Sequence, residues 1–320
     1  MKSLILDVLE NRVLGWPLRL LGGLTRGRPK ILGFINPFYV PRWTVERHGA
    51  RLLADHDDYV ARVSKDSRIV RFDPGTYEPE ISYLIETLIK PDDVVLDIGA
   101  NVGLHTVAFA HAAAQGHVFA FEPVDEMADK LSRNCALNGI ENVTLVRCAL
   151  GDAETTMDMN VNIAGKGMEG TSSLTSTVHV DAHPEWYDRR RVPVRRLDDL
   201  IGDLMPEARI GFVKIDTEGF ETFIIKGGLD VLRRDRPRMI LEAHTRRLAA
   251  AGKSFQWYLD TFPDYHVLVI YAPSRANPYL RLEPLDPDQP EIAVNLLLLP
   301  RLAELQGDRI DAPKPIAVED

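Results

Sequence analysis

The chain contains Val94-Val95-Leu96-Asp97-Ile98-Gly99-Ala100-Asn101-Val102-Gly103, an apolar run that leads directly into a turn with two glycines. Gly99 and Gly103 allow the backbone to approach a ligand closely at the carboxyl end of a strand, where doubly wound sheets bind nucleotides. Their G-x-x-x-G spacing differs from the G-x-G-x-x-G pattern of dinucleotide sites, and no Gly-Lys-Ser or Gly-Lys-Thr of a P-loop follows. The turn therefore disfavours a dinucleotide-dependent oxidoreductase.

Short apolar runs alternate with helix-like stretches from about residue 92 onward, which is typical of βαβ units in a mainly parallel sheet. The sequence predicts strands at residues 94–98, 117–121, 143–149, 211–215 and 239–242, and helices at residues 104–114, 126–138, 221–234 and 245–259. Two further apolar runs, residues 265–271 and 294–299, are expected to close the sheet as a hairpin. The predicted fold class is α/β and Rossmann-like.

The composition fits a folded globular protein of 320 residues, with 45% hydrophobic and 27% charged residues. The formal net charge of -9 argues against broad electrostatic binding of nucleic acid and favours a small-molecule or carbohydrate substrate. The two cysteines, Cys135 and Cys148, exclude a disulfide framework and a cysteine metal cluster. A reducing, cytoplasmic setting is the expectation.

Three regions are expected along the chain: an N-terminal extension (1–74), a catalytic domain (75–302) and a polar tail (303–320). Charged residues interrupt the apolar residues of the N-terminal segment, so neither a signal peptide nor a membrane span is predicted. Basic residues in 1–30 are compatible with a weak contact with an anionic membrane surface, although a packed amphipathic helix is favoured. The polar excursion at 153–192 is interpreted as a lid or binding loop.

A second acidic residue follows the next predicted strand. Residues 117–121 end on Glu122, about twenty residues beyond the glycine turn, which is the usual distance for a carboxylate that binds both ribose hydroxyls. Asp97 and Glu122 together fit a ligand with a ribose and a cationic methionine part, and without phosphates.

The ordered set of motifs from about Gly75 to Pro300 resembles the FkbM family of methyltransferases. The most specific of them is Lys214-Ile215-Asp216-Thr217-Glu218-Gly219-Phe220-Glu221. The others are Gly75-Thr76-Tyr77-Glu78-Pro79-Glu80, residues 97–103, Phe121-Glu122-Pro123, Asn134 with Leu137-Asn138-Gly139, Ala149-Leu150-Gly151-Asp152, residues 170–174, Leu197-Asp198-Asp199-Leu200, and Glu242 with His244.

The resemblance implies a class I methyltransferase fold, with a seven-stranded, mainly parallel sheet whose last strand is antiparallel. It also implies S-adenosylmethionine as cofactor and methylation usually at oxygen, often on sugars or natural products. The acceptor and the oligomeric state are not specified by it. N-methylation, C-methylation and a non-catalytic module that binds the cofactor are the alternatives.

The cofactor site expected from the motifs surrounds the glycine turn. Ala149 and Leu150 are expected to bracket the adenine, and Asp152 to reach its amino group; a plain strand-to-turn exit is the alternative. Tyr77 and Glu78 are expected to fold over the cofactor, or else to act as an aromatic anchor and a helix N-terminal carboxylate. The full set of expected cofactor-binding residues is Tyr77, Glu78, Asp97, Gly99, Ala100, Asn101, Gly103, Glu122, Pro123, Ala149, Leu150, Asp152 and Asp216.

Catalytic candidates lie at two neighbouring strand ends. Asp216 follows one predicted strand, Glu218 is expected to begin the next helix, and Glu242 and His244 alternate to one face of the following strand. Methyl transfer to a hydroxyl requires alignment and removal of a proton, so Glu218, Glu242 or His244 is the candidate base, and the pKa of His244 suits neutrality best. A structural hydrogen-bond cluster is one alternative. A divalent cation on Asp216 and Glu242 is another, which the resemblance does not require.

Overall fold

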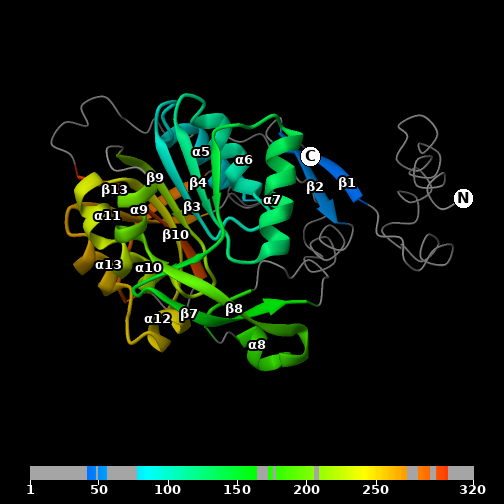
Figure 1. Ribbon diagram of the computed structural model, residues 1–320. Coiled ribbons are helices and arrows are strands. Elements are labelled where there is room, and N and C mark those ends of the chain that lie inside the picture. Colours follow the sequence, from blue (N-terminus) through cyan, green and yellow to red (C-terminus); the bar gives the residue numbers. More distant parts are fainter. Residues whose placement is uncertain are drawn as a thin grey trace, which may run out of the picture.

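The computed structural model describes residues 42–47, 50–55, 78–163, 172–175, 178–204, 209–271, 280–288 and 293–301. The expectations for residues 1–30, for Tyr77 and for the tail 303–320 lie outside these ranges. Within the expected N-terminal extension, strands β1 (Arg42–Arg47) and β2 (Ala50–Asp55) pair antiparallel, and β2 lies beside helix α7 (Figure 1). None of the helices in these ranges has the length and apolarity that a membrane crossing needs.

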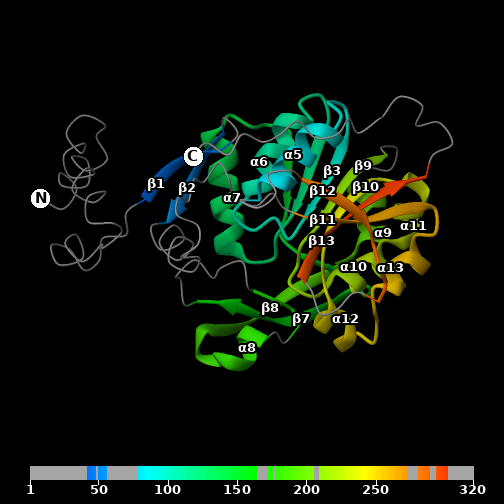
Figure 2. The same ribbon diagram turned by 180° about the vertical axis from the view of Figure 1, so that it is seen from behind.

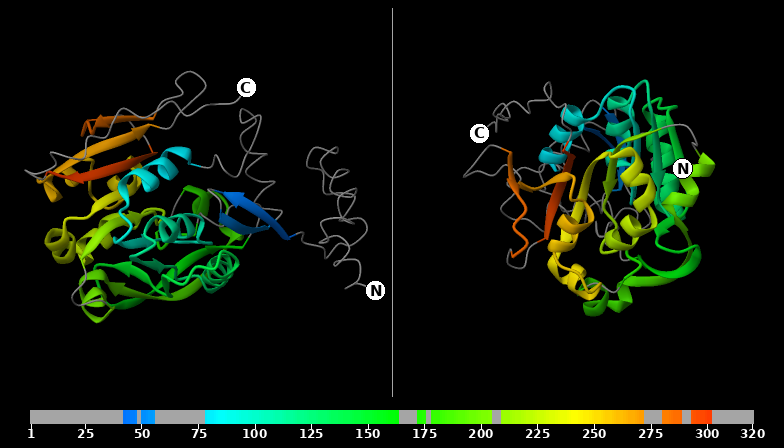
Figure 3. Two further views of the ribbon diagram at one scale, coloured as in Figure 1. Left: turned by 90° about the horizontal axis from the view of Figure 1, so that it is seen from above. Right: turned by 90° about the vertical axis from the view of Figure 1, so that its left-hand side faces the viewer.

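The main sheet has eight strands in the order β12-β11-β13-β10-β9-β3-β4-β5. Their bounds are β3 (Val94–Ile98), β4 (His117–Phe121), β5 (Val143–Val146), β9 (Ile210–Ile215), β10 (Arg238–His244), β11 (Tyr265–Tyr271), β12 (Arg281–Pro284) and β13 (Ala293–Pro300). Strand β13 runs antiparallel to both β10 and β11, whereas the neighbours from β10 to β5 are parallel. The predicted α/β Rossmann-like class I fold is confirmed. Strand β12 is an addition at the edge, visible with β11 and β13 in orange to red (Figures 2 and 3).

Helices cover both faces of the sheet, and strand alternation assigns the side chains to them. One face is covered by α5 (Pro79–Leu88), α6 (Leu104–Ala112) and α7 (Asp125–Leu137) (Figure 1). The other face is covered by α9 (Leu197–Leu204), α10 (Glu221–Gly227), α11 (Leu229–Asp235) and α13 (Gln256–Thr261). The short helix α12 (Thr245–Ala250) follows β10. On β3, Leu96 and Ile98 enter the α9–α13 core, while Val95 packs with α5 and α6. Asp97 therefore faces α6.

Two predicted helices are each divided into two. The predicted helix 221–234 breaks at Gly228, where a Cβ atom would lie 2.6 Å from Leu197 Cδ2, so only glycine permits the close packing. The predicted helix 245–259 ends at Ala250, and Gly252 follows with φ of 68°. The predicted strand 143–149 is likewise divided, because its last residue belongs to a separate strand, β6 (Ala149–Gly151).

The polar excursion contains regular structure. Strands β7 (Thr155–Asn162) and β8 (Tyr187–Arg196) are antiparallel and form a three-stranded sheet with β6, in the order β6-β8-β7. The helices α8 (Val178–Ala182) and η3 (Pro184–Trp186) precede β8. A buried apolar cluster stabilises this sheet and includes Val124 from outside it. The members from β7 and β8 are Met159, Val161, Val192 and Val194. It lies along one side of the main sheet (Figure 1).

Candidate active site

A cavity of about 370 Å³ opens at the carboxyl ends of β3, β4 and β9, within the size range of small-ligand sites. Eleven of the residues expected from the sequence line it: Glu78, Asp97, Gly99, Ala100, Asn101, Glu122, Pro123, Ala149, Leu150, Asp216 and Glu218. Gly103, Asp152, Glu242 and His244 are not among its lining residues. Gly103 instead packs against α7, since a Cβ atom there would lie 2.8 Å from Leu131 Cγ.

The glycine turn brings β3 against the end of β9. Gly99 has φ of 82°, and a Cβ atom on it would lie 2.0 Å from the carbonyl oxygen of Asp216. Asn101 also has a positive φ, of 51°. The turn thus holds the Gly99 backbone so close to that of Asp216 that no side chain at position 99 would fit.

Asp97 is a buried carboxylate with an unused acceptor. Its Oδ2 accepts a hydrogen bond from Thr106 Oγ1 at 2.5 Å, while its buried Oδ1 has no partner among the described residues. Burial raises the pKa of Asp97, and the neighbouring Lys214 on β9 opposes that rise. Because burying an acceptor without a donor is costly, this oxygen is suited to a cationic N–H donor of a ligand.

Lys214 supplies positive charge beneath the cavity. Its Nζ lies 2.9 Å from Asp216 Oδ2, and its side chain is almost fully buried. Burial alone lowers the pKa of Lys214, but the carboxylates of Asp216, Asp97 and Glu78 outweigh burial and raise it. Lys214 is therefore ionised and holds Asp216 in place.

Glu122 directly follows β4 and orders the loop after that strand. Its Oε2 accepts the Asn101 backbone N–H at 2.9 Å, and its Oε1 accepts the Val124 N–H at 2.8 Å. Burial raises the pKa of Glu122 to about 7 despite these two donors. Each carboxylate oxygen keeps a second lone pair, so both remain able to accept hydroxyl donors of a ribose.

One wall of the cavity is largely apolar. Ala149 and Leu150 line it as expected, whereas Asp152 is exposed and does not. Sequence reasoning missed four residues that complete this wall: Met127, Met159, Leu174 and Phe220. Met159 and Leu174 come from the polar excursion, which therefore forms part of the same cavity as Asp97.

Glu78 also lines the cavity and directly precedes α5. Its Oε2 contacts His105 Nε2 at 2.8 Å, and His105 also lines the cavity. Glu78 has φ of 46° and makes no side-chain cap hydrogen bond to α5. The contact with His105 places Glu78 at the cavity, as the expected fold over the cofactor requires.

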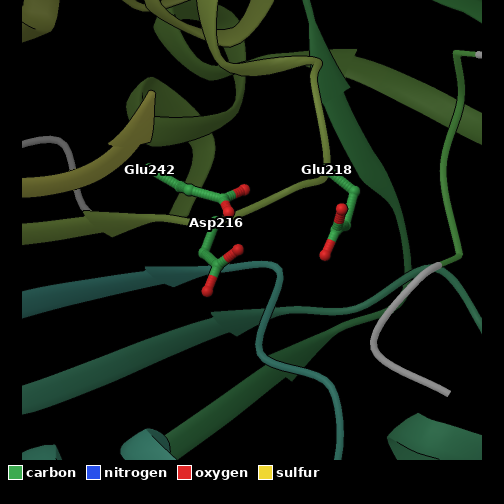
Figure 4. A group of neighbouring side chains, drawn as sticks. All are labelled: Asp216, Glu218 and Glu242. Atoms are coloured by element: carbon green, nitrogen blue, oxygen red, sulfur yellow. The ribbon is translucent and has the colours of Figure 1, made fainter. Parts of the chain in front are cut away.

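Three carboxylates converge beside the cavity (Figure 4). Asp216, Glu218 and Glu242 each bring one oxygen within 4.8 Å of the others. Glu218 was expected to begin a helix, but α10 begins at Glu221; Glu218 lies in the preceding loop with φ of 58°. The Glu221 carboxylate holds this loop by accepting the N–H groups of Thr217 at 3.1 Å and Gly219 at 3.0 Å.

Arg247 is the residue of this cluster that sequence reasoning missed. From α12 its guanidinium donates to the carboxylates of both Glu218 and Glu242. Burial is the largest cause that raises the pKa values of these two carboxyls; Asp216 adds to the rise, and Arg247 opposes it. The only feature of the sequence that could have indicated this pairing is the position of Arg247, a cationic residue five positions after Glu242.

His244 is separate from the acidic cluster. Its Nδ1 accepts the Arg246 N–H at 3.1 Å and so caps α12. Burial lowers the pKa of His244, with Arg247 and Arg246 contributing in the same direction. A neutral imidazole that accepts at Nδ1 carries its proton on Nε2, so neither nitrogen is ready to take a proton. This geometry disfavours His244 as the base.

The charges of the cluster bear on the metal alternative. Oxygen donors of this kind suit Mg²⁺, and three are within reach of one ion. However, Lys214 pairs with Asp216, and Arg247 pairs with Glu218 and Glu242, so two protein cations already balance most of the negative charge. We therefore expect no metal requirement.

The family model described as Methyltransferase FkbM domain matches residues 97–266. Methyltransferase 1 of Beauveria bassiana is 28% identical over 147 residues, which are 43% of this chain and 59% of that protein. The chain thus spans less than two thirds of that relative's length. The 2-O-methyltransferase NoeI of Sinorhizobium fredii is 27% identical over 218 residues, 64% of this chain and 88% of that protein.

Two further similarities come from an archaeal relative and a solved structure. The hexuronic acid methyltransferase AglP of Haloferax volcanii is 24% identical over 200 residues, 60% of this chain and 75% of that protein. The crystal structure of a methyltransferase FkbM from Methylobacillus flagellatus aligns with a TM-score of 0.40 at 18% identity, covering 69% of this chain and 50% of that chain.

Proposed function

This chain belongs to the FkbM family of S-adenosylmethionine-dependent methyltransferases, and from that premise we propose that it methylates a hydroxyl group of a sugar or related natural product. One observation carries the proposal. Glu218 is the only one of the three candidate bases that lines the cavity in which Asp97 and Glu122 also lie.

The described residues fit the cofactor. The unpaired Oδ1 of Asp97 suits the methionine ammonium, the Glu122 carboxylate suits the ribose hydroxyls, and Ala149 and Leu150 suit the adenine. When bound, the cofactor supplies a methyl group activated by its sulfonium. The apolar residues Met127, Met159 and Phe220 exclude water from the wall of the cavity that contains Ala149 and Leu150.

We assign to Glu218 the role of receiving the proton that the acceptor hydroxyl loses as its oxygen gains the methyl group. Burial raises the pKa of Glu218, which brings its basicity toward the operating pH of a general base. Arg247 holds one carboxylate oxygen, Oε2, and so limits the rotamers of the side chain. Asp216, fixed by Lys214, lies beside Glu218 and would add negative charge on the side of the bound sulfonium.

The acceptor class rests on the relatives. NoeI is a 2-O-methyltransferase, and AglP acts on a hexuronic acid by its name. A carbohydrate acceptor with free hydroxyls agrees with the net charge of -9, which disfavours nucleic acid.

The test is transfer of a radiolabelled methyl group to a panel of monosaccharides, disaccharides, hexuronic acids, hydroxylated metabolites and amines. We expect label on a carbohydrate or metabolite hydroxyl, located by NMR of the product. Label on nitrogen or carbon only, or no transfer to any hydroxyl-bearing class in a protein that binds the cofactor, would refute O-methylation.

The pH dependence of cofactor affinity follows from Glu122. Its pKa in the free protein is about 7, and ribose hydroxyls favour the ionised form, so the pKa falls on binding. Affinity is therefore full above pH 7 and declines as the pH falls below it. We expect S-adenosylhomocysteine to bind about tenfold more weakly at pH 6 than at pH 8 by calorimetry. Glu122→Gln should abolish this pH dependence of affinity, and Glu218→Gln should keep it. If the pH dependence persists in Glu122→Gln, a group other than Glu122 causes it.

A further inference from the structure

Residues 172–175 of the excursion lie against the loop that carries Glu218. Ser173 is fully buried, and its backbone exchanges two hydrogen bonds with Asn160 of β7, at 2.9 and 3.0 Å. This bridge attaches the segment to the three-stranded sheet. The segment is therefore held by regular structure at this point.

The Ser173 hydroxyl connects that sheet to Glu218. Its Oγ accepts the Thr175 N–H at 3.1 Å and donates to the Glu218 carbonyl oxygen at 2.8 Å. Thr175 Oγ1 reaches the same carbonyl at 3.4 Å. Two hydroxyls from the excursion thus converge on one backbone oxygen.

The carbonyl that they bind belongs to a residue in an unfavourable conformation. Glu218 has φ of 58°, which non-glycine residues adopt only when their surroundings impose it. The side chain of Glu218 is held by Arg247 and its backbone by Ser173 and Thr175. Loss of the Ser173 bond would leave the Glu218 carbonyl with only the longer Thr175 contact, while Arg247 still holds the carboxylate.

The neighbours of Ser173 face the cavity. Ser172 and Leu174 both line the cavity, whereas Ser173 between them points to Glu218, as alternation along an extended segment requires. A ligand that contacts Ser172 or Leu174 therefore restricts the residue between them, Ser173, which binds the Glu218 backbone.

We propose that Ser173 is a positioning residue for Glu218, and that the segment 172–175 couples cofactor binding to the placement of the base. The proposal rests on the proposed role of Glu218 as proton acceptor. Ser173 itself touches neither cofactor nor acceptor; it acts through the Glu218 backbone.

A double-mutant cycle tests the positioning role. Ser173→Ala is expected to lower kcat by about ten- to a hundredfold and to change the KM values for cofactor and acceptor less than about twofold, because misplacing a reacting group affects the rate more than binding. In the Glu218→Gln background, Ser173→Ala should lower kcat little further, because the group that Ser173 positions is already lost. Ser132→Ala, on the exposed side of α7, is the matched control with unchanged kinetics. Equal losses in both backgrounds, or an unchanged kcat, would overturn the proposal.

Hydrogen exchange tests the coupling without any acceptor, so its outcome is independent of whether the enzyme methylates hydroxyls. In the wild-type protein, S-adenosylhomocysteine should slow exchange of the Thr217 and Gly219 amides, which Glu221 binds. Ser173→Ala should remove most of that slowing, although it still binds S-adenosylhomocysteine with an affinity within a few fold of wild type. Equal slowing in both proteins would refute the coupling.

Discussion

Glu218→Gln is expected to lower turnover by about a hundredfold or more with the acceptor found in the panel, which is the usual contribution of a positioned general base. Glutamine keeps the shape of the side chain and an oxygen for Arg247, but it cannot take a proton. The dissociation constant of S-adenosylmethionine should change less than about threefold, because Glu218 is assigned to the acceptor. Single-turnover rates and calorimetry measure the two effects separately.

Three comparisons make this result specific. Glu141→Gln alters an exposed carboxylate and should leave turnover unchanged. Glu242→Gln should have a smaller effect than Glu218→Gln, since Glu242 does not line the cavity and contributes by binding Arg247 and by its charge beside Glu218. A chelator should leave the wild-type rate unchanged. Near-wild-type turnover in Glu218→Gln, or loss with the chelator that Mg²⁺ restores, would contradict the base mechanism.

Gly99→Ala is expected to weaken cofactor binding by about a hundredfold and to lower the melting temperature. The added Cβ would lie 2.0 Å from the Asp216 carbonyl oxygen, a backbone atom that cannot rotate away, so the turn and the end of β9 must separate. Gly139→Ala is a matched control, because Gly139 has a similar φ of 65° but nothing within 4 Å of its added Cβ. Calorimetry and thermal unfolding of the two variants distinguish collision from backbone strain. Equal affinities in the two variants would show that the close approach at Gly99 is not needed.

The parallel part of the sheet could be predicted because its strands are short, apolar and separated by turn residues. Asp97 and Glu122 follow directly from this pattern, since one lies near the end of β3 and the other directly after β4, at the same edge of the sheet. The three-stranded sheet was missed, although Met157, Met159 and Val161 alternate with polar residues along β7, which is the pattern of a half-buried strand. The edge strand β12 lies in a turn-rich connection with no alternating signal.

The contacts that arrange the candidate base were not visible in the sequence. Arg247 and Ser173 reach Glu218 from segments 29 and 45 residues away, and no spacing rule relates them. His244 looked suitable from its ordinary pKa alone, but its position at the start of α12 commits Nδ1 to capping. The structure therefore favours Glu218 over His244, which its ordinary pKa alone had favoured.

The most direct test of the account is a calorimetric titration of the wild-type protein, Asp97→Ala and the exposed control Asp92→Ala with S-adenosylmethionine. We predict one site per chain in the wild type and in Asp92→Ala. Asp97→Ala should bind about ten- to a hundredfold more weakly, because it loses a charge-assisted hydrogen bond worth about 1.5–3 kcal/mol. Absence of binding to the folded wild-type protein, or an unchanged affinity in Asp97→Ala, would contradict the assignment of the cavity as the cofactor site.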